Sequence, residues 1–272
     1  MHYETIQPPV HLRGHVRFFW TLESHGTNPT PKTFGPIADG CPGIIFQHAH
    51  KGIFYDQQQK RLPEIFLFGQ TTKHMQLHTT GNLHAIGVYL YPTALNAVFG
   101  LNAFELTNSC LDLDDLAVKQ GLDLSEQLVN TDSKTEQIEL LSSWLYSQIR
   151  KNKPKEEGAV QYILGRISQA KGNVSLKDLQ AEVRMTERSF ERKFKQSVGI
   201  SPKLYSRVCR FQASLQQLRN NQYKSLTDIA FENGYADQSH FIRAFKEFAG
   251  FSPWQYQKQS KELVQNFPEL LK

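Results

Sequence analysis

Long apolar runs are missing from this sequence of 272 residues. No run reaches the roughly 18 to 20 residues that a membrane-spanning helix needs, and the start of the chain lacks the basic and apolar stretches of a secretory signal. Cysteine is also scarce. The three cysteines, Cys41, Cys110 and Cys209, lie too far apart in the sequence to indicate a disulfide framework or a clustered zinc site. These absences predict a reduced, cytoplasmic protein without a membrane segment.

The common catalytic fingerprints are absent too. The sequence has no Gly-x-Ser-x-Gly motif, no P-loop and no glycine-rich dinucleotide motif. None of the three cysteines stands in the context that a reactive methyl-accepting thiol needs. We therefore expect neither enzymatic activity nor a cofactor.

Charge is distributed unequally between the two halves of the chain. Residues 1–150 carry 10 basic and 14 acidic side chains, whereas residues 151–272 carry 21 basic and 12 acidic ones. The C-terminal half is thus strongly basic, which suggests a polyanionic partner.

The N-terminal part predicts β-structure. Short segments rich in β-branched and aromatic residues are separated by clusters of Gly, Pro, Asn and Asp, which is typical of a sandwich or small barrel; they are Val16–Leu22, Gly43–Gln47, Ile65–Gly69 and Ala85–Tyr91. Helices are expected afterwards, over Thr93–Leu101, Leu113–Val129 and Thr135–Arg150. Leu141 and Leu145, on the last of these, can pair two subunits or pack on the β-domain, and we favour the packing.

The C-terminal part predicts helices throughout and contains an internal repeat. Residues 189–202 and 240–253 are identical at seven of fourteen positions, with an offset of 51. In each copy a short helix after a serine cap is followed by a turn and a longer basic helix that ends at Gly199 or Gly250. This arrangement is the helix-turn-helix unit, and the second helix of such a unit enters the major groove of DNA.

The second unit carries a specific resemblance. Gly234-Tyr-Ala-Asp-Gln-Ser-His-Phe-Ile-Arg-Ala-Phe-Lys246, followed by Gly250-Phe-Ser-Pro253, resembles the DNA-binding domain of AraC/XylS-type transcription regulators. The resemblance covers residues 159–258. The first unit departs from it at Gln180, where the family usually has Ala, and at Arg184, where it often has Gly.

The repeat and the resemblance predict which residues contact double-stranded DNA. Phe190, Phe194, Phe241 and Phe245 should pack inward, which leaves the opposite faces for DNA. The predicted contact residues are Thr186, Glu187, Arg188, Glu191, Arg192 and Lys195 in the first unit, and Gln238, Ser239, His240, Arg243 and Lys246 in the second. Arginine can bind guanine with two hydrogen bonds, and Gln can pair with adenine. Arg192 and Arg243 could instead pair with a neighbouring acid, and His240 could fill space or contact phosphate.

The N-terminal half more weakly resembles the β-rich modules that precede this DNA-binding domain in related regulators. The matching pieces include Phe18-Phe-Trp20, Ala38-Asp-Gly40 and Gly87-Val-Tyr-Leu-Tyr-Pro92. The resemblance implies a cupin-like domain that binds a small effector or pairs subunits. We assign Trp20, His48 and Tyr89 to a predicted effector site.

The predicted fold is therefore α+β with two domains. Residues 1–104 are a β-rich, cupin-like barrel or sandwich for effector binding or dimerisation, 105–150 a helical extension and 151–158 a linker. Residues 159–258 are an all-α domain with two helix-turn-helix units joined by a long helix, and 259–272 are a C-terminal tail. The predicted function is sequence-specific regulation of transcription, as an activator that can contact RNA polymerase and form a homodimer.

Two alternatives remain at this point. The N-terminal domain could only dimerise, which would make the regulator constitutive. The chain could also be a metal-dependent cupin enzyme fused to a DNA-binding domain, because His48-Ala-His50 places two imidazoles on one face of a strand. The glutamate that usually follows in such enzymes is missing, and His74, His78 and His84 have no known metal-site spacing, so we predict no metal.

Overall fold

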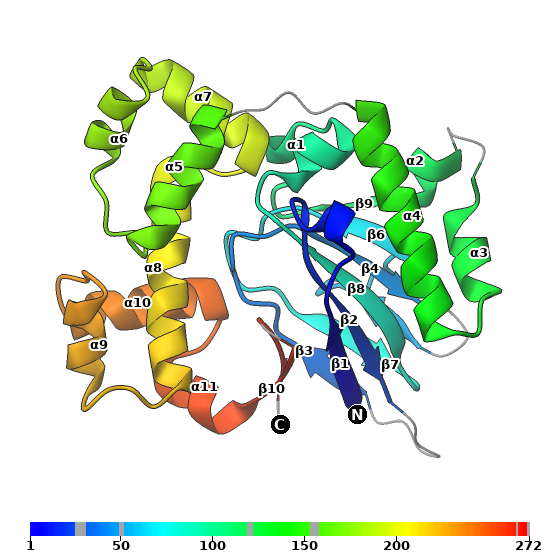
Figure 1. Cartoon of the computed structure of the whole chain (residues 1–272). Coiled ribbons are helices and arrows are strands. Elements are labelled where there is room, and N and C mark those ends of the chain that lie inside the picture. The colour runs from blue at the N-terminus through cyan, green and yellow to red at the C-terminus, as the bar shows by residue number, and fades with distance from the viewer. Residues whose placement is uncertain (25–30, 49–51, 119–121, 153–157, 265, 271–272) are drawn as a thin grey trace.

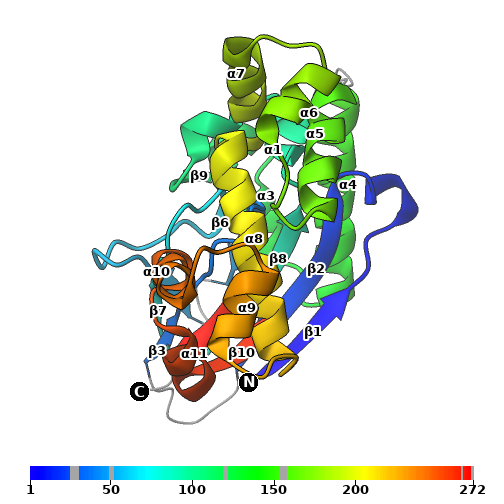
Figure 2. The ribbon, with the colours of Figure 1, turned by 90° about the vertical axis from the view of Figure 1, so that its left-hand side faces the viewer.

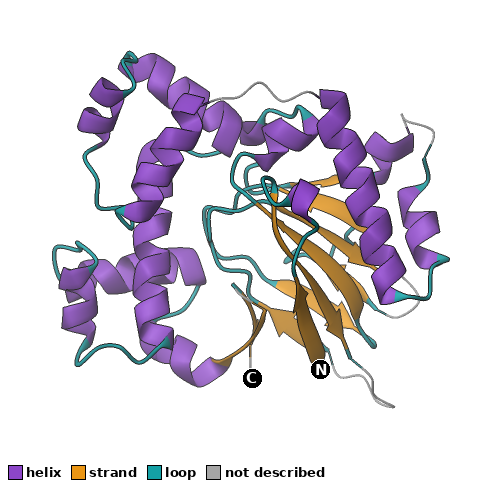
Figure 3. Cartoon of the chain, in the orientation of Figure 1, coloured by secondary structure: helices purple, strands orange, loops and turns teal. Residues whose placement is uncertain are grey.

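The computed structural model describes residues 1–24, 31–48, 52–118, 122–152, 158–264 and 266–270. It has the predicted α+β organisation in two parts, a β-rich N-terminal domain and a helical C-terminal domain (Figure 1). Figure 3 shows that the strands gather on one side of the molecule and the C-terminal helices on the other. No helix in the described residues is long and apolar enough to span a membrane.

The larger sheet has six antiparallel strands in the order β1-β2-β8-β4-β6-β9. The strands are β1 (His2–Ile6), β2 (Val16–Glu23), β8 (His84–Leu90), β4 (Gly43–Gln47), β6 (Ile65–Phe68) and β9 (Cys110–Asp112). The four strands predicted from the sequence are β2, β4, β6 and β8, and all four are confirmed.

The smaller sheet draws on both ends of the chain. Its order is β10-β11-β3-β7-β5, with β3 (Lys32–Phe34), β5 (Ile53–Tyr55) and β7 (Leu77–Thr80) from the N-terminal part. Strands β10 (Ser260–Val264) and β11 (Phe267–Leu270) form a hairpin, and β11 pairs with β3. The segment expected as a tail is therefore a structural part of the N-terminal domain.

The two sheets face each other as a sandwich, and neither closes into a barrel among the described residues. Trp20, Ile45 and Tyr89 of the larger sheet lie in one core with Phe34 and Phe267 of the smaller sheet. Residues of the opposite face, such as Phe19, Ile44 and Val88, form a second core with the helices. Because both faces of the larger sheet are covered, its strands β4, β6 and β8 are mainly apolar along both faces.

The helical layer on the larger sheet contains η1 (Val10–Leu12), α1 (Ala94–Phe99), η2 (Ala103–Leu106), α2 (Asp114–Val118), α3 (Leu124–Val129) and α4 (Lys134–Asn152). The single helix predicted over Leu113–Val129 is wrong, since α2 and α3 are separate; residues 119–121 between them are outside the described part. Leu141 and Leu145 of α4 are fully buried against the sheet, which confirms the packing interpretation.

The C-terminal domain consists of α5 (Gly158–Gln169), α6 (Leu176–Glu182), α7 (Glu187–Val198), α8 (Pro202–Arg219), α9 (Leu226–Glu232), α10 (Gln238–Ala249) and α11 (Pro253–Gln259). The predicted caps are present. Ser175, Thr186, Ser225 and Asp237 each accept a hydrogen bond from the first turn of a helix, and Gly199 and Gly250 end α7 and α10 in the left-handed conformation. A reciprocal capping box is complete at Ser225 but not at Ser175.

The two domains pack directly on each other. Most of the predicted linker, residues 153–157, lies outside the described residues. Ile37 and Ala38, from the segment between β3 and β4, are buried in the core of the C-terminal domain. Ala38 N donates to Phe248 O of α10, and Gln212 Nε2 of α8 donates to Ala38 O at 2.7 Å.

Candidate DNA-binding surface and ligand cavity

The first candidate DNA-binding helix is α7. Thr186 caps it by accepting a hydrogen bond from Ser189 N at 3.3 Å, and Phe190 and Phe194 anchor its inner face in the domain core. Arg188 and Arg192 lie on the exposed side. Neither forms an ion pair with a described residue, whereas Lys195 Nζ lies 3.6 Å from Glu191 Oε2. Both arginines therefore keep their guanidinium groups available for a partner.

The second candidate helix is α10, where Gln238, Ser239, Arg243 and Lys246 are exposed. Gln238 is oriented by Thr227, whose hydroxyl donates to Gln238 Oε1 at 2.9 Å. Arg243 forms no ion pair with any residue in the described ranges. His240 differs from its neighbours because it is half-buried, and its ring packs edge-on against Tyr235 at 5.3 Å. That contact fits the space-filling interpretation of His240.

The connecting helix α8 sets the separation of α7 and α10. It has 18 residues, which corresponds to about 27 Å at 1.5 Å per residue. Figure 2 shows α7 beyond the start of α8 and α10 beside its middle, where Arg207 and Phe211 of α8 contact Phe248 of α10. Helix α8 therefore holds α7 and α10 at separate points along one axis, as two helices that enter successive major grooves on one face of DNA require.

The two departures of the first unit from the family pattern form one local structure. Arg184 has φ of 50°, and Gly234, at the equivalent position of the second unit, has φ of 71°. The turn thus needs a left-handed residue, which explains why glycine is usual there. Gln180 Nε2 donates to Met185 O at 3.1 Å and so braces the strained turn around Arg184.

The N-terminal domain contacts the first candidate helix. Helix α7 packs against η2 and α1, and a surface crevice is lined by Asn102 and Phe104 together with Arg188, Glu191, Arg192, Lys195 and Gln196. Thr107 Oγ1 donates to Gly199 O at 2.7 Å at the end of α7. Four of the predicted DNA-contact residues therefore border the N-terminal domain.

A cavity of about 470 Å³ lies in the N-terminal domain, between the two sheets. Its walls are mainly apolar and include Trp20, Ile45, Phe66, Leu77 and Phe267. Of the predicted effector residues, Trp20 and Tyr89 line it. His48 is not in its lining, and the His48 ring lies 6.2 Å from that of His84.

One corner of the cavity is polar and is built around Asp39. The Asp39 carboxylate accepts hydrogen bonds from Cys41 N at 3.0 Å, from the hydroxyl of Tyr89 and, at 3.4 Å, from Asn266 Nδ2. Burial raises the pKa of Asp39 and of Tyr89, and it raises the pKa of the Cys41 thiol to about 12. Behind them, Arg17 Nη1 lies 3.2 Å from Cys41 Sγ.

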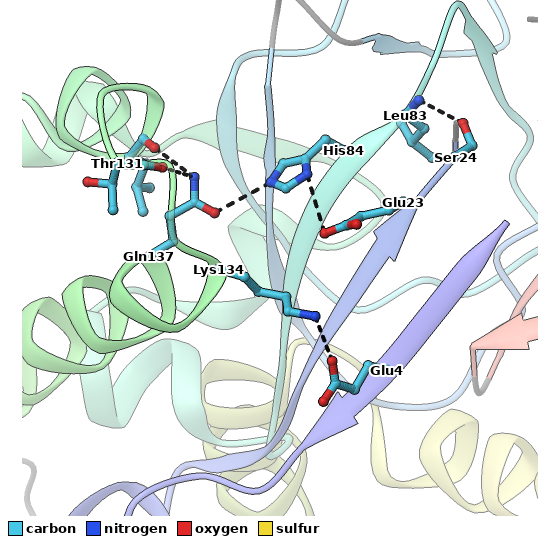
Figure 4. A network of polar contacts seen from close by, with 9 residues as sticks. Glu4, Glu23, Ser24, Leu83, His84, Thr131, Lys134 and Gln137 are labelled. Atoms are coloured by element: carbon cyan, nitrogen blue, oxygen red, sulfur yellow. Dashed lines mark hydrogen bonds and ion pairs between the residues drawn. The ribbon is translucent and has the colours of Figure 1, made fainter. Parts of the chain in front are cut away.

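The predicted effector residue His48 and its neighbour His84 both lie outside the cavity lining. His84 Nδ1 lies 3.6 Å from Glu23 Oε1, and Nε2 lies 3.4 Å from Gln137 Oε1 of α4 (Figure 4). Lys134 Nζ pairs with Glu4 Oε2 at 2.7 Å in the same region. These contacts fasten α4 to the sheet. His50 is outside the described residues, and no group of three metal-ligating side chains occurs within them.

Sequence reasoning missed Asp39, Asn266 and Phe267. Asp39 belongs to a segment quoted only for its resemblance, and its role depends on contacts with strands far along the chain. An apolar residue after a turn-forming Asn near the end of the chain is a weak hairpin signal. It does not identify the sheet that the hairpin joins.

Comparisons with known proteins agree with the two-part organisation. Residues 179–259 match the family described as a helix-turn-helix domain. Residues 4–112 match the family described as a domain of unknown function (DUF6597).

Two curated relatives are transcription regulators. The chain is 32% identical over 92 residues to an uncharacterised HTH-type transcriptional regulator of Haemophilus influenzae, covering 34% of this chain and 30% of the relative. It is 24% identical over 197 residues to the HTH-type transcriptional activator RhaS of Klebsiella pneumoniae, covering 72% of this chain and 58% of the relative. The chain thus spans about a third to somewhat over half of these relatives' lengths.

Among solved structures, ToxT from Vibrio cholerae aligns over 88% of this chain and 97% of its own, with 14% identity and a TM-score of 0.48. A second ToxT structure, with an unsaturated fatty acid bound, aligns with a TM-score of 0.43 and 14% identity over 88% of this chain and 94% of its own.

Proposed function

We propose that this chain, whose C-terminal domain is an AraC-type helix-turn-helix domain, is a sequence-specific DNA-binding regulator of transcription. One observation carries the proposal. Two equivalent helices, α7 and α10, present Arg192 and Arg243 at matching positions, and neither arginine forms an ion pair within the described residues; the helix α8 connects the two units. A target that repeats at the spacing of successive major grooves suits this arrangement.

The proposed roles of the side chains follow from their exposure. Arg188, Arg192, Gln238 and Arg243 reach base edges, because they are exposed and lie early enough on each helix. Ser239 and Lys246 hold phosphates. Thr186 acts as a helix cap, and His240 supports the helix through Tyr235.

A small molecule in the N-terminal cavity controls DNA binding in this proposal. The cavity favours this control by a ligand over a constitutive regulator, because a domain that only dimerises needs no ligand-sized space between its sheets. The buried faces of α4 leave Leu141 and Leu145 unavailable for pairing subunits. A homodimer would have to use another surface.

The remaining features of the proposal concern partners and location. The chain acts in the cytoplasm without catalytic activity, binds double-stranded DNA and, as an activator, contacts RNA polymerase. The helix-turn-helix domain and the regulator relatives support this assignment.

The test is the mapping of bound DNA in the native host, with selection of binding sequences by the purified chain as its counterpart. We expect a few sharp sites near promoters that share a motif spanning two successive major grooves. Diffuse binding without a motif, weakening steeply with salt, would contradict sequence-specific regulation. A variant with both Arg192→Ala and Arg243→Ala should lose the motif, whereas Arg13→Ala, an exposed arginine of the N-terminal domain, should keep it.

A further inference from the structure

The interior of the cavity between the sheets contains several aromatic side chains, among them Trp20, Phe66 and Phe267. The indole of Trp20 lies directly over Gly87 on the neighbouring strand, where any Cβ would fall 1.8 Å from the ring. Phe267 stacks beside Trp20 with ring centroids 5.8 Å apart. Glycine at residue 87 therefore lets the indole lie flat against the sheet, and the space above it stays open for an apolar body.

At the polar corner a ligand meets the Asp39 carboxylate, whereas the Arg17 guanidinium lies behind Cys41 and is not among the lining residues. Asp39 is half-buried, and its donors are Cys41 N, the Tyr89 hydroxyl and Asn266 Nδ2. Its two oxygens offer about four acceptor positions, so one remains for a ligand. The other charged lining residues lie elsewhere in the wall: Lys73 is exposed, and Asp56 Oδ1 accepts from Gln58 N and Lys60 N of its own turn.

An anionic ligand would therefore fit poorly at the Asp39 corner. Two carboxylates at close range in a largely apolar cavity repel each other, and both lose hydration. A hydroxyl group meets no such penalty and can donate to the free acceptor position.

The loop of residues 69–76, which supplies part of the cavity wall, contacts the C-terminal domain at two equivalent points. His74 lines the cavity and packs on Gly250 at the end of α10, where a Cβ would lie 2.6 Å from the imidazole ring. Gln70, next to the lining residue Thr71, packs in the same way on Gly199 at the end of α7, with a corresponding distance of 3.1 Å. One loop thus contacts the C-terminal ends of both candidate DNA-binding helices.

The polar corner has its own connection to that domain. Asn266 donates to Asp39 Oδ2 and accepts from Arg219 Nη2 of α8 at 3.2 Å. Arg219 Nε also donates to the hydroxyl of Tyr256 in α11 at 3.0 Å. A ligand that shifts Asn266 therefore acts on the helix that separates α7 from α10.

We propose that the cavity binds an uncharged, mainly apolar small molecule that donates a hydrogen bond to Asp39. Its binding is transmitted to α7 and α10 through the loop of residues 69–76 and through Asn266. This inference rests on the proposed function for its biological meaning, but ligand binding and its structural transmission are measurable without DNA.

The test uses three probes with the same apolar body, namely 4-phenylbutan-1-ol, butylbenzene and 4-phenylbutanoate, titrated calorimetrically into the full chain at pH 7.5. We expect the alcohol to bind with a dissociation constant between about 10 µM and 1 mM. The alcohol should bind about tenfold more tightly than the carboxylate and severalfold more tightly than the hydrocarbon. Equal or tighter binding of the carboxylate, or no binding of any probe, would overturn the ligand class.

The Asp39→Asn variant separates ligand contact from folding. It keeps the shape of the side chain and removes its charge, so affinity for the alcohol should fall severalfold while affinity for the carboxylate rises. A merely structural role for Asp39 would weaken all three probes together. Gly87→Ala, which forces the Trp20 indole toward the cavity, should weaken all three and serves as the steric reference.

Transmission is tested by amide hydrogen exchange of the full chain with and without the alcohol. We expect altered exchange in residues 69–76 and at the ends of α7 and α10, near Gly199 and Gly250. Altered exchange confined to the sheets would contradict transmission while leaving ligand binding intact. Ligand binding and transmission without any specific DNA site would instead refute the proposed function alone.

Discussion

At the level of single residues, exposure and pairing decide which basic side chains are free to contact DNA. Arg243 and Arg192 are exposed and unpaired within the described ranges, whereas Lys195 is held by Glu191, Arg166 by Glu182 and Arg207 by Glu247. A sequence contains all of these arginines and lysines but does not show which have intramolecular partners. The unpaired ones are the stronger candidates for base contacts.

Arg243→Ala should weaken binding to the cognate site by about 1–3 kcal/mol and relax base preference at the position that it contacts. The loss follows from two hydrogen bonds to a base that no neighbouring side chain can replace. Binding assays with the cognate site and with single-base variants measure it. An equal loss on every sequence would make Arg243 a phosphate contact instead.

Thiol reactivity should differ sharply among the three cysteines. Burial raises the pKa of Cys41 to about 12 and of Cys209 to about 11, so at pH 8 only about one in 10⁴ and one in 10³ of these groups is the reactive thiolate. Burial also raises the pKa of Cys110, but its side chain is exposed. We expect Ellman's reagent to react rapidly with one thiol per folded chain, with none in the Cys110→Ser variant, and with three in the chain unfolded in urea. Rapid labelling of Cys41 in the folded chain would contradict this structure.

At the level of elements, the two helix-turn-helix units show how one backbone requirement is met by different residues. The turn of the second unit uses Gly234, whereas the turn of the first holds Arg184 in the left-handed conformation and braces it with Gln180. The two sequence departures therefore meet at one place, Gln180 at the end of α6 and Arg184 in the turn after it, and neither lies on α7.

The equivalent turn positions should respond oppositely to substitution. Arg184→Gly should stabilise the chain by up to about 1 kcal/mol. The substitution removes the steric cost of holding a non-glycine residue in the left-handed conformation, and this gain exceeds the entropic cost of fixing glycine. Gly234→Ala should destabilise it by about 1–3 kcal/mol, since the new Cβ would lie 2.3 Å from Asn173 Oδ1.

Urea unfolding of both variants measures these changes in the free energy of unfolding. Gly165→Ala in α5 is the control, because that position is open and helical and alanine should be neutral or stabilising there. A neutral Gly234→Ala would mean that the turn tolerates a side chain, and the strain argument would fail.

At the level of the whole molecule, the chain crosses between its domains twice. It enters the DNA-binding domain after α4 and returns through α11 to add the β10–β11 hairpin to the N-terminal sheet (Figure 1). The cavity is therefore completed by residues that follow the DNA-binding domain in sequence, and truncation after α11 would remove one of its walls.

Phe267→Ala should destabilise the N-terminal domain by about 3 kcal/mol, in the range for buried phenylalanines. Phe267 stacks on Phe34 with centroids 4.9 Å apart and an interplanar angle of 16°. Thermal unfolding followed by near-ultraviolet circular dichroism measures the effect. The control is Lys261→Ala, which changes an exposed residue of the same hairpin. An equal loss of stability in both variants would contradict a specific role of Phe267 in the core.

Local interactions in the sequence determined the helices of the C-terminal domain, their caps, the inward faces of Phe190 and Phe241 and four of the six strands of the larger sheet. Capping, periodicity and turn residues act over a few positions, so they can be recognised without a structure. The fold class and the DNA-binding helices follow from them.

Contacts between distant segments decided the rest. The placement of α7 against η2, the packing of His74 and Gln70 on two helix-ending glycines, and the cavity with Asp39 and Phe267 depend on residues as much as 227 positions apart, such as Asp39 and Asn266. No local pattern specifies such pairs, because their free energy arises only when both segments are buried together. The exposed face of each helix that we propose to contact bases was predictable from the sequence, whereas the cavity proposed to control it was decided by the tertiary structure.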